Sequence, residues 1–420
     1  MTSKRIILKN NLRILDYVFN IFTLLMFIWG LRVLILEGFV YSWPRKFSGD
    51  FSAVMFGPDY WDGSGFVYGP IFTGQKIFVE NFPNIFTSFS FAIMNIFLAT
   101  ASLILCSLAI GLKRKELPLI LAIWTCFMPL TYAFSVSANP EFLELLFLSL
   151  SWYFLASNRL TRAWVSVVAG ALTKVIPIIF FVILVFRRSP RASFAAFTFF
   201  VVTVLGLGLL RSMSPIQAVS ATLIPSLNMP GGKVEMSDLI RPVPSSLQML
   251  GLNSAIARAF SMTDGADSLA RVQYITWLIS GFIFLMSCLI IVRLLTGSYA
   301  IPEKAKLTCS YIILFSNLPL LTQMPHLHTF IFLVPAFTGL AWLVLNETNS
   351  RTKILLLLSL SILYLIVGIP GVLIKFLNFI SIREYEFMLL YDPIWANLVL
   401  IVISNVYVFS KTIRSKQMTS

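Results

Sequence analysis

Residues 163–186 read AWVSVVAGALTKVIPIIFFVILVF, a hydrophobic run with a lysine, Lys174, and a proline, Pro177, near its centre. The run is long enough to cross a bilayer as one helix. Both flanks are basic, however, with two arginines shortly before the run and three shortly after it. Lys and Arg accumulate on the cytoplasmic side of membrane proteins, and proline interrupts a helix. The sequence therefore predicts a helical hairpin that enters and leaves on the cytoplasmic side and turns near Lys174 and Pro177.

The whole chain has the composition of a membrane protein. Of its 420 residues, 58% are hydrophobic and 12% are charged, and the mean hydropathy is +0.85. Soluble domains carry about twice this share of charged residues. The apolar runs lack the alternation of barrel strands, and only helices or closed barrels satisfy their backbone in hydrocarbon. We therefore expect an all-α polytopic membrane protein with a single transmembrane domain over residues 1–420.

The basic residues and the cysteines argue against two other classes of protein. The net charge of +14 comes from short clusters between apolar runs, where topology and anionic headgroups explain it, so we expect no nucleic-acid partner. Cys106, Cys126, Cys288 and Cys309 lie inside apolar segments without CxxC spacing. They are expected to be packing residues rather than disulfide or metal-binding residues.

The distribution of Lys and Arg orders the remaining apolar runs. Four basic residues before residue 16 place the N-terminus in the cytoplasm. The expected spans are 16–38, 86–111, 117–137, 140–157, 192–210, 272–292, 307–324, 329–346, 354–374 and 393–410. These ten spans and the hairpin give about twelve helical segments, with both termini cytoplasmic. The basic clusters and the absence of a retention signal favour a prokaryotic plasma membrane.

Two long polar stretches fall on the outer side in this topology, at 39–85 and 211–271. The first mixes aromatic residues with Pro and Gly, and its part 72–82 could form an amphipathic surface helix. The second contains five prolines and apolar residues at near-helical spacing over 247–260, which predict a short helix at the bilayer interface. Two such loops could roof a cavity that opens to lipid. That shape suits a substrate with a lipid tail and a polar head.

The first outer loop holds the main acidic candidate, Asp50. A carboxylate in an outer cavity could act as a general base. It could also cap the surface helix that follows or pair with Arg45 or Lys46. Asp59 and Asp62 lie in the run GPDYWDG, which predicts a turn, and are structural or acceptor-contacting residues.

The only two histidines, His326 and His328, lie at the outer end of a span. An imidazole there can donate a hydrogen bond to a phosphate oxygen. A metal site would need more ligands, and residues two apart on a helix point in different directions. We therefore interpret His328 as a phosphate contact and expect no metal; a role in capping the helix end is the alternative.

Lys174 is a charge inside a membrane segment and thus a candidate functional residue. It could neutralise a donor phosphate, or it could support the hairpin turn and pair with Glu141 or Glu144; the sequence favours the structural role. The two acids fall on one helical face and could line the cavity. Four outer basic residues could also reach a phosphate, or could be ordinary charges that contact water or headgroups: Lys233, Arg241, Lys375 and Arg383.

Four stretches, taken in order, resemble the landmarks of glycosyltransferase family 87. They are Gly49-Asp50-Phe51, residues 67–72 (VYGPIF), residues 170–177 (GALTKVIP) and residues 321–335 (LTQMPHLHTFIFLVP). That family belongs to the GT-C superfamily of membrane glycosyltransferases and includes mannosyltransferases that use polyprenyl-phosphate mannose. The last landmark departs from the family pattern, because His326 stands near the usual tryptophan and Thr329 replaces the second of two histidines.

The resemblance implies a GT-C-like bundle and an inverting transfer on the outer face. A sugar, most often mannose, would pass from a polyprenyl-phosphate donor to a lipid-linked or glycan acceptor, with Asp50 as the base and without a cofactor. The expected partners are this donor, this acceptor and membrane lipids. Asp59, Asp62, Tyr68 and Glu141 are the candidate acceptor or loop contacts.

Two alternatives are compatible with many membrane helices. A transporter or lipid flippase also needs about a dozen helical segments, but such folds commonly repeat a broken helix in both halves, and only one break, at 173–177, is found. A non-catalytic membrane scaffold needs no acid in the first loop. We therefore expect an enzyme.

Overall fold

The structure is a computed structural model of the chain. The described residues are 88–135, 140–187, 189–228, 251–259, 266–299, 301–322, 327–347, 349–368 and 393–417, with isolated positions at 24, 28, 70, 71, 77, 79, 81 and 82. Within these ranges the chain forms helices and no β-strand. The expected all-α fold is therefore confirmed.

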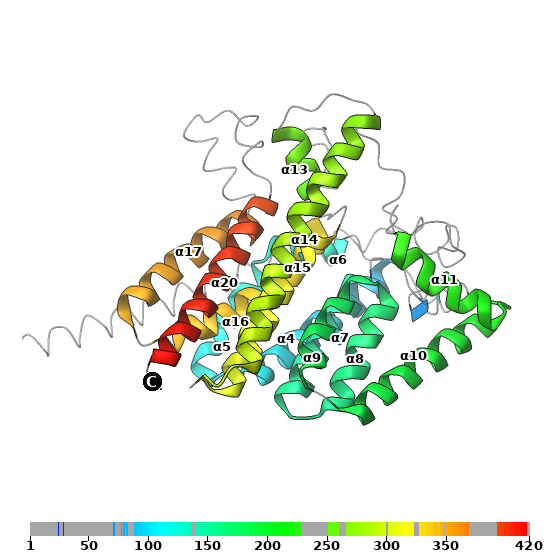
Figure 1. The fold of residues 1–420 in the computed structure, drawn as a ribbon, viewed down its shortest axis with the longest axis horizontal. Coiled ribbons are helices and arrows are strands. Elements are labelled where there is room, and N and C mark those ends of the chain that lie inside the picture. The colour runs from blue at the N-terminus through cyan, green and yellow to red at the C-terminus, as the bar shows by residue number, and fades with distance from the viewer. Residues whose placement is uncertain are drawn as a thin grey trace, which may run out of the picture.

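The helices follow one another along the chain as Figure 1 labels them. Their bounds are α4 (Ser88–Ile110), η3 (Arg114–Glu116), α5 (Leu117–Thr125), α6 (Met128–Ser135), α7 (Glu141–Ala156), α8 (Leu160–Thr173), η4 (Ile176–Phe180), α9 (Phe181–Val185), α10 (Pro190–Leu210), α11 (Pro215–Asn228), α13 (Leu252–Ala259), α14 (Ala266–Thr296), α15 (Glu303–Leu321), η6 (Leu327–Phe332), α16 (Leu333–Leu345), α17 (Ser350–Gly368) and α20 (Pro393–Gln417). Here η marks a 3₁₀ helix.

Most expected spans correspond to single helices, but two are divided. Among the described helices, α4, α10 and α14 are long and apolar enough to cross a membrane by length and composition. The expected span 117–137 consists of α5 and α6, which are separated at Cys126 and Phe127, and the span 329–346 consists of η6 and α16. The span 16–38 and the loop 39–85 lie almost entirely outside the described residues.

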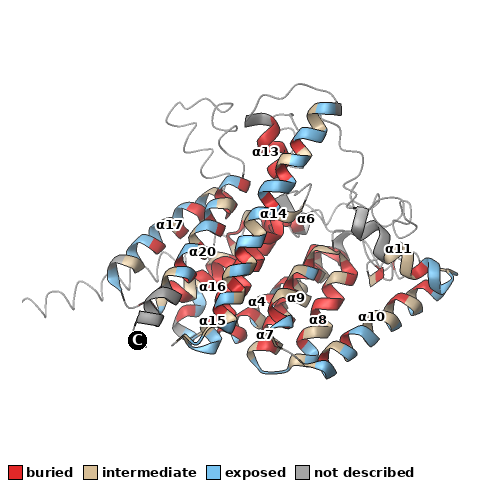
Figure 2. Cartoon of the chain, in the orientation of Figure 1, coloured by how far each residue is buried: buried red, intermediate tan, exposed pale blue. Residues whose placement is uncertain are grey.

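The centre of the bundle is α15. Every residue from Lys306 to Leu320 is buried, and the helix packs against α14, α16 and α20. Figure 2 shows this buried interior beside the exposed faces of α10, α14 and α17. Since the chain is a membrane protein, those exposed apolar faces contact lipid. Three of the four cysteines, Cys106, Cys126 and Cys309, are buried, and none forms a disulfide.

An aromatic cluster joins α7, η4 and α15. The rings of Trp152 and Tyr311 stack with centres 5.2 Å apart, and the centre of Phe180 lies 5.1 Å from that of Phe315. The hydroxyl groups of Ser151 and Tyr311 are 2.8 Å apart and share a hydrogen bond. Aromatic pairs of this kind add stability beyond the area that they bury. The cluster fixes η4, the middle of the predicted hairpin, against the central helix.

The predicted hairpin reverses direction as expected. Ring centres of Trp164 in α8 and Phe181 in α9 are 5.3 Å apart, and a Cβ on Gly170 would lie 3.2 Å from the Cβ of Pro177. Residues 164 and 181, and residues 170 and 177, are therefore paired across one turn. The hairpin is confirmed, with its tip at Lys174.

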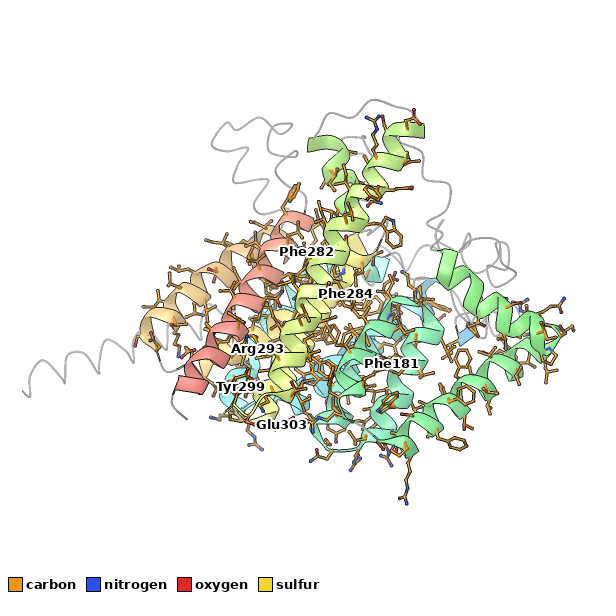
Figure 3. All side chains as sticks on the ribbon, in the orientation of Figure 1. Phe181, Phe282, Phe284, Arg293, Tyr299 and Glu303 are labelled. Carbon is orange, nitrogen blue, oxygen red and sulfur yellow. The ribbon has the colours of Figure 1, made fainter. Side chains whose placement is uncertain are left out.

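Basic connections gather at one end of the bundle, which we call the basic end. The turns α4–α5, α7–α8, α9–α10, α14–α15 and α16–α17 lie along the lower edge of Figure 1. Figure 3 labels Arg293, Tyr299 and Glu303 there, and Arg187 pairs with Glu303. The side chain of Lys306 donates a hydrogen bond to the carbonyl of Gly297 across the same turn. The tip of the hairpin lies at the opposite end.

The stretch 211–271 is partly helical. It contains α11 and α13, and α14 already begins at Ala266. The short helix expected within 247–260 is present as α13, whose residues Leu252 to Ala257 are buried. It packs against the upper part of α14 (Figure 1).

Candidate functional site

Three charged side chains meet at the tip of the hairpin and form a charge cluster: Glu141, Glu144 and Lys174. The two acids come from the first turn of α7, which begins directly after Pro140. Acidic residues are favourable there because the helix N-terminus carries partial positive charge. Since residues three apart share a helical face, both carboxylates can be directed at one neighbour.

The backbone explains how Lys174 reaches α7. Helix α8 ends at Thr173, and Lys174 is extended, with φ −155° and ψ 143°. Its N–H donates a hydrogen bond to the carbonyl of Gly170, which closes α8. Pro177 then occupies the first turn of η4, where its missing N–H leaves no bond unmade. The helix break therefore turns the lysine out of the α8 path.

Lys174 forms a largely buried ion pair with Glu141. Its Nζ lies 2.9 Å from Oε1 of Glu141, and the two side chains are 13% and 1% exposed. The pairing expected from the sequence is thus present. A buried charge needs such a partner, because its desolvation would otherwise be very costly.

Glu144 adds a second carboxyl group to the same ammonium. The residue is 1% exposed, and its Oε1 has no hydrogen-bond partner among the described residues. Glu144 lies close enough to Lys174 and Glu141 to interact with both electrostatically. The ammonium of Lys174 is already matched by the carboxylate of Glu141, so the cluster offers no surplus positive charge to an anion. This geometry indicates a structural contact that holds the tip of the hairpin against α7.

A second candidate part of the site is the short helix η6, which carries His328. This short helix packs against α6, α7 and α15, and its residues Thr329 and Phe330 are buried. Helix α15 starts at the basic end and α7 finishes there, so the beginning of η6, which follows α15, and the charge cluster at the start of α7 both lie toward the opposite end of the bundle. The side chain of His328 is not among the described ones.

The structure brings together two of the predicted site residues, Glu141 and Lys174. The remaining candidates lie outside the described residues: Asp50, Asp59, Asp62, Tyr68, Arg241, His326, Lys375 and Arg383. In the first outer loop the described positions are isolated, and one of them, Ile71, packs against a cluster from α8, α10 and α11 that consists of Val168, Leu172, Ala196, Val204 and Ala218.

The sequence analysis missed a polar contact between three helices. The Nδ2 atoms of Asn317 in α15 and Asn405 in α20 donate hydrogen bonds of 3.1 and 3.0 Å to the hydroxyl of Ser287 in α14. Amide side chains inside apolar segments are the signal that could have found it, because polar groups in hydrocarbon seek partners on other helices. This contact joins helices and lies away from the charge cluster.

The comparison with protein families gives one match. The family model of glycosyltransferase family 87 matches residues 66–317, which is more than half of the chain. The matched stretch includes the charge cluster and the whole hairpin, whereas Asp50 and His328 lie just outside it. A comparison with curated proteins finds no match.

Proposed function

This chain belongs to glycosyltransferase family 87, a family of membrane glycosyltransferases, and we propose that its donor is a polyprenyl-phosphate sugar, most simply polyprenyl-phosphate mannose. The acceptor in this proposal is a lipid-linked or glycan hydroxyl group. The observation that carries the proposal is the family match, which runs through the hairpin and the charge cluster. A donor with a lipid tail also suits a chain whose outer helix faces contact hydrocarbon.

The proposed reaction inverts the configuration of the sugar in one displacement. The carboxylate of Asp50 takes the proton from the acceptor hydroxyl as its oxygen attacks the anomeric carbon. The bond from that carbon to the phosphate oxygen breaks, and polyprenyl phosphate leaves with the bonding electrons. Charge on the leaving phosphate needs hydrogen-bond donors or cations. His328 is the proposed hydrogen-bond donor to this phosphate, and the candidate cations are Arg241, Lys375 and Arg383.

The charge cluster has a positioning role in this proposal. Lys174 is engaged by Glu141, so its main task is to hold the hairpin tip in place beneath the reacting groups. Glu141 shares this positioning role, because its carboxylate is 1% exposed and is paired with Lys174. Support comes from the position of the cluster, which lies at the same end of the bundle as the first residues of η6.

We also propose that the basic end faces the cytoplasm of a prokaryotic cell and that transfer takes place at the outer face of the plasma membrane. The gathering of basic turns at one end supports this orientation, because Lys and Arg are retained on the cytoplasmic side. Both termini are cytoplasmic in this arrangement.

The test is sugar transfer from polyprenyl-phosphate mannose to a crude lipid extract by the purified chain. Wild type is compared with Asp50→Asn, which removes the base at nearly constant size, and with Asp267→Asn, at an exposed position in the first turn of α14, as a matched control. Transfer by wild type and Asp267→Asn that is lost in Asp50→Asn supports the proposal. Equal transfer by all three removes Asp50 from the reaction, and no transfer by wild type shows that the proposed donor is wrong. Thermal unfolding of each variant confirms that it is folded.

A further inference from the structure

Helix α17 lies at the edge of the bundle and carries a tyrosine that reaches inward, Tyr364 (Figure 1). The outer face of this helix is apolar and exposed at Leu355, Leu358 and Ile362, which contact lipid. The hydroxyl of Tyr364 instead donates a hydrogen bond of 2.6 Å to the backbone carbonyl of Ile123 in α5. Carbonyls inside a helix normally accept from the backbone N–H four residues later, so this bond to a side chain needs a reason.

The reason is the break between α5 and α6. The carbonyl of Ile123 would need the N–H of Phe127, but Phe127 lies outside both helices. The N–H of Cys126 bonds to a different carbonyl, and no backbone N–H in the described part of the chain bonds to that of Ile123. A carbonyl without a donor is costly inside a membrane bundle. Tyr364 therefore supplies the hydrogen bond that the interruption of the helix removes.

Phe127, the residue at the break, is enclosed by aromatic rings of α16 and α17. It is 0% exposed, and its ring centre lies 6.0 Å from that of Phe337 and 5.7 Å from that of Tyr364. A Cβ on Gly368 would lie only 2.8 Å from Cδ2 of Phe127, so this contact requires a glycine. Side chains of α17 and α16 thus fix the break through a hydrogen bond and aromatic contacts.

Helix α6 connects this break to the candidate site. It packs mainly against η6, and η6 in turn has α6 as its main neighbour. His328, the proposed hydrogen-bond donor to the leaving phosphate, belongs to η6, and the next residues Thr329 and Phe330 are buried. Because the backbone hydrogen bonds between α5 and α6 are interrupted, the placement of α6 depends on the side chains at the break. A shift of α6 is passed to η6 through closely packed surfaces.

We propose that Tyr364 is a positioning residue for sugar transfer, which fixes the break between α5 and α6 and thereby holds η6 and His328 at the leaving phosphate. This role rests on the proposed function and adds to it a residue beyond the matched stretch 66–317. Tyr364 does not touch the donor. Its effect on transfer passes through His328, so the two residues should act as one unit.

The first test is a double-mutant cycle on sugar transfer from polyprenyl-phosphate mannose. Tyr364→Phe removes only the hydroxyl and is expected to lower kcat/KM for the donor about tenfold, because small misplacements of reacting groups are costly. In the His328→Ala background the same change should lower kcat/KM less than about twofold, because the group that Tyr364 positions is gone. Independent losses, which multiply in the double variant, would overturn the proposal. So would an unchanged kcat/KM in Tyr364→Phe.

Tyr407→Phe is the matched control. It also removes a hydroxyl that makes a buried hydrogen bond, to Oε2 of Glu347 over 3.0 Å, but this pair lies at the turn α16–α17 at the basic end. Its kcat/KM should equal that of wild type when rates are measured below the unfolding midpoint of each variant. A loss equal to that of Tyr364→Phe would show that lowered stability alone explains the effect. Gly368→Ala, which displaces Phe127 directly, should reproduce the loss seen in Tyr364→Phe.

A second measurement follows His328 without sugar transfer. In a His326→Ala background His328 is the only histidine of the chain, so its modification by diethyl pyrocarbonate can be followed by mass spectrometry. Tyr364→Phe and Gly368→Ala should raise the modification rate, because a loosened η6 opens more often, and Tyr407→Phe should not. Equal rates in all variants would overturn the proposal even in a protein that transfers mannose. Raised rates in a protein that transfers no mannose would reject the proposed donor and support the placement of His328 by Tyr364.

Discussion

The ammonium of Lys174 lies 2.9 Å from Oε1 of Glu141, although the two residues are 33 positions apart in the chain. This contact connects the tip of the hairpin to the first turn of α7. Glu141 is 1% exposed and Lys174 is 13% exposed, so water can hardly solvate the carboxylate if the lysine is removed.

Replacing Lys174 with methionine should therefore destabilise the protein strongly. Removing one partner of a buried ion pair typically costs about 3–5 kcal/mol. The expected result is a large fall in the midpoint of thermal unfolding in detergent, whereas Lys113→Met, at an exposed position, should have little effect. The double variant Glu141→Gln/Lys174→Met should recover part of the loss. A double variant no more stable than Lys174→Met would contradict the ion pair.

Gly170 should tolerate no large side chain. A Cβ there would lie 3.2 Å from the Cβ of Pro177 and 3.6 Å from the Cβ of Phe147, so the residue is enclosed by η4 and α7. Gly170→Leu should cost about 1–3 kcal/mol or more, because it separates the hairpin arms. Gly206→Leu in α10 is the control, since nothing lies within 4 Å of a Cβ at that position. Equal unfolding midpoints for the two variants would argue against the close hairpin packing.

Thr338→Val should lower the stability of the protein, because it removes the acceptor of a hydrogen bond between α5 and α16. The Nε1 of Trp124 donates to Oγ1 of Thr338 over 2.9 Å, and both residues are buried. Valine would leave the indole N–H without an acceptor, at a cost of about 1–3 kcal/mol. Thr125→Val is the matched control. It makes the same chemical change, but the Thr125 hydroxyl donates its hydrogen bond to the carbonyl of Leu121 in its own helix. Thermal unfolding of the two variants separates the effects, and a smaller loss for Thr338→Val would refute this account.

His328→Ala should reduce sugar transfer if His328 contacts the donor phosphate as proposed. A hydrogen bond to a charged group contributes about 1.5–3 kcal/mol, so kcat/KM for the donor should fall about tenfold to a hundredfold. His326→Ala, two residues away, should have a smaller effect. The measurement is initial rate against donor concentration for both variants, after their unfolding midpoints are matched to wild type. Unchanged kcat/KM in His328→Ala would remove this residue from the site.

The hairpin could be predicted from the sequence because a charge, Lys174, and a proline, Pro177, stand three residues apart in one apolar run with basic flanks. Proline alone is a weaker signal. Pro129 stands in the first turn of α6, directly after the interruption at Cys126 and Phe127, whereas Pro319 lies inside α15. A proline disfavours helix in the residue before it, but packing against neighbouring helices decides whether the helix ends. The division of 117–137 into α5 and α6 therefore depends on contacts that a single sequence does not contain.

The sequence predicted that Lys174 pairs with one of two acids, Glu141 or Glu144. Glu141 and Glu144 share one helical face, so spacing alone could not choose between them. The choice depends on the extended backbone of Lys174, which the fold imposes at the end of α8. Likewise, Ser287, Asn317 and Asn405 come from three distant segments, and only the packing of α14, α15 and α20 shows that they meet.

The ion pair at the hairpin tip also bears on how the chain is made. During synthesis Glu141 leaves the ribosome before Lys174, so α7 is available in the translocon when the lysine arrives. A hairpin that carried Lys174 alone into the bilayer would be costly to insert. Neutralisation by an acid already present lowers that cost, and the order of the two residues in the gene therefore favours insertion of α7 and the hairpin as one unit.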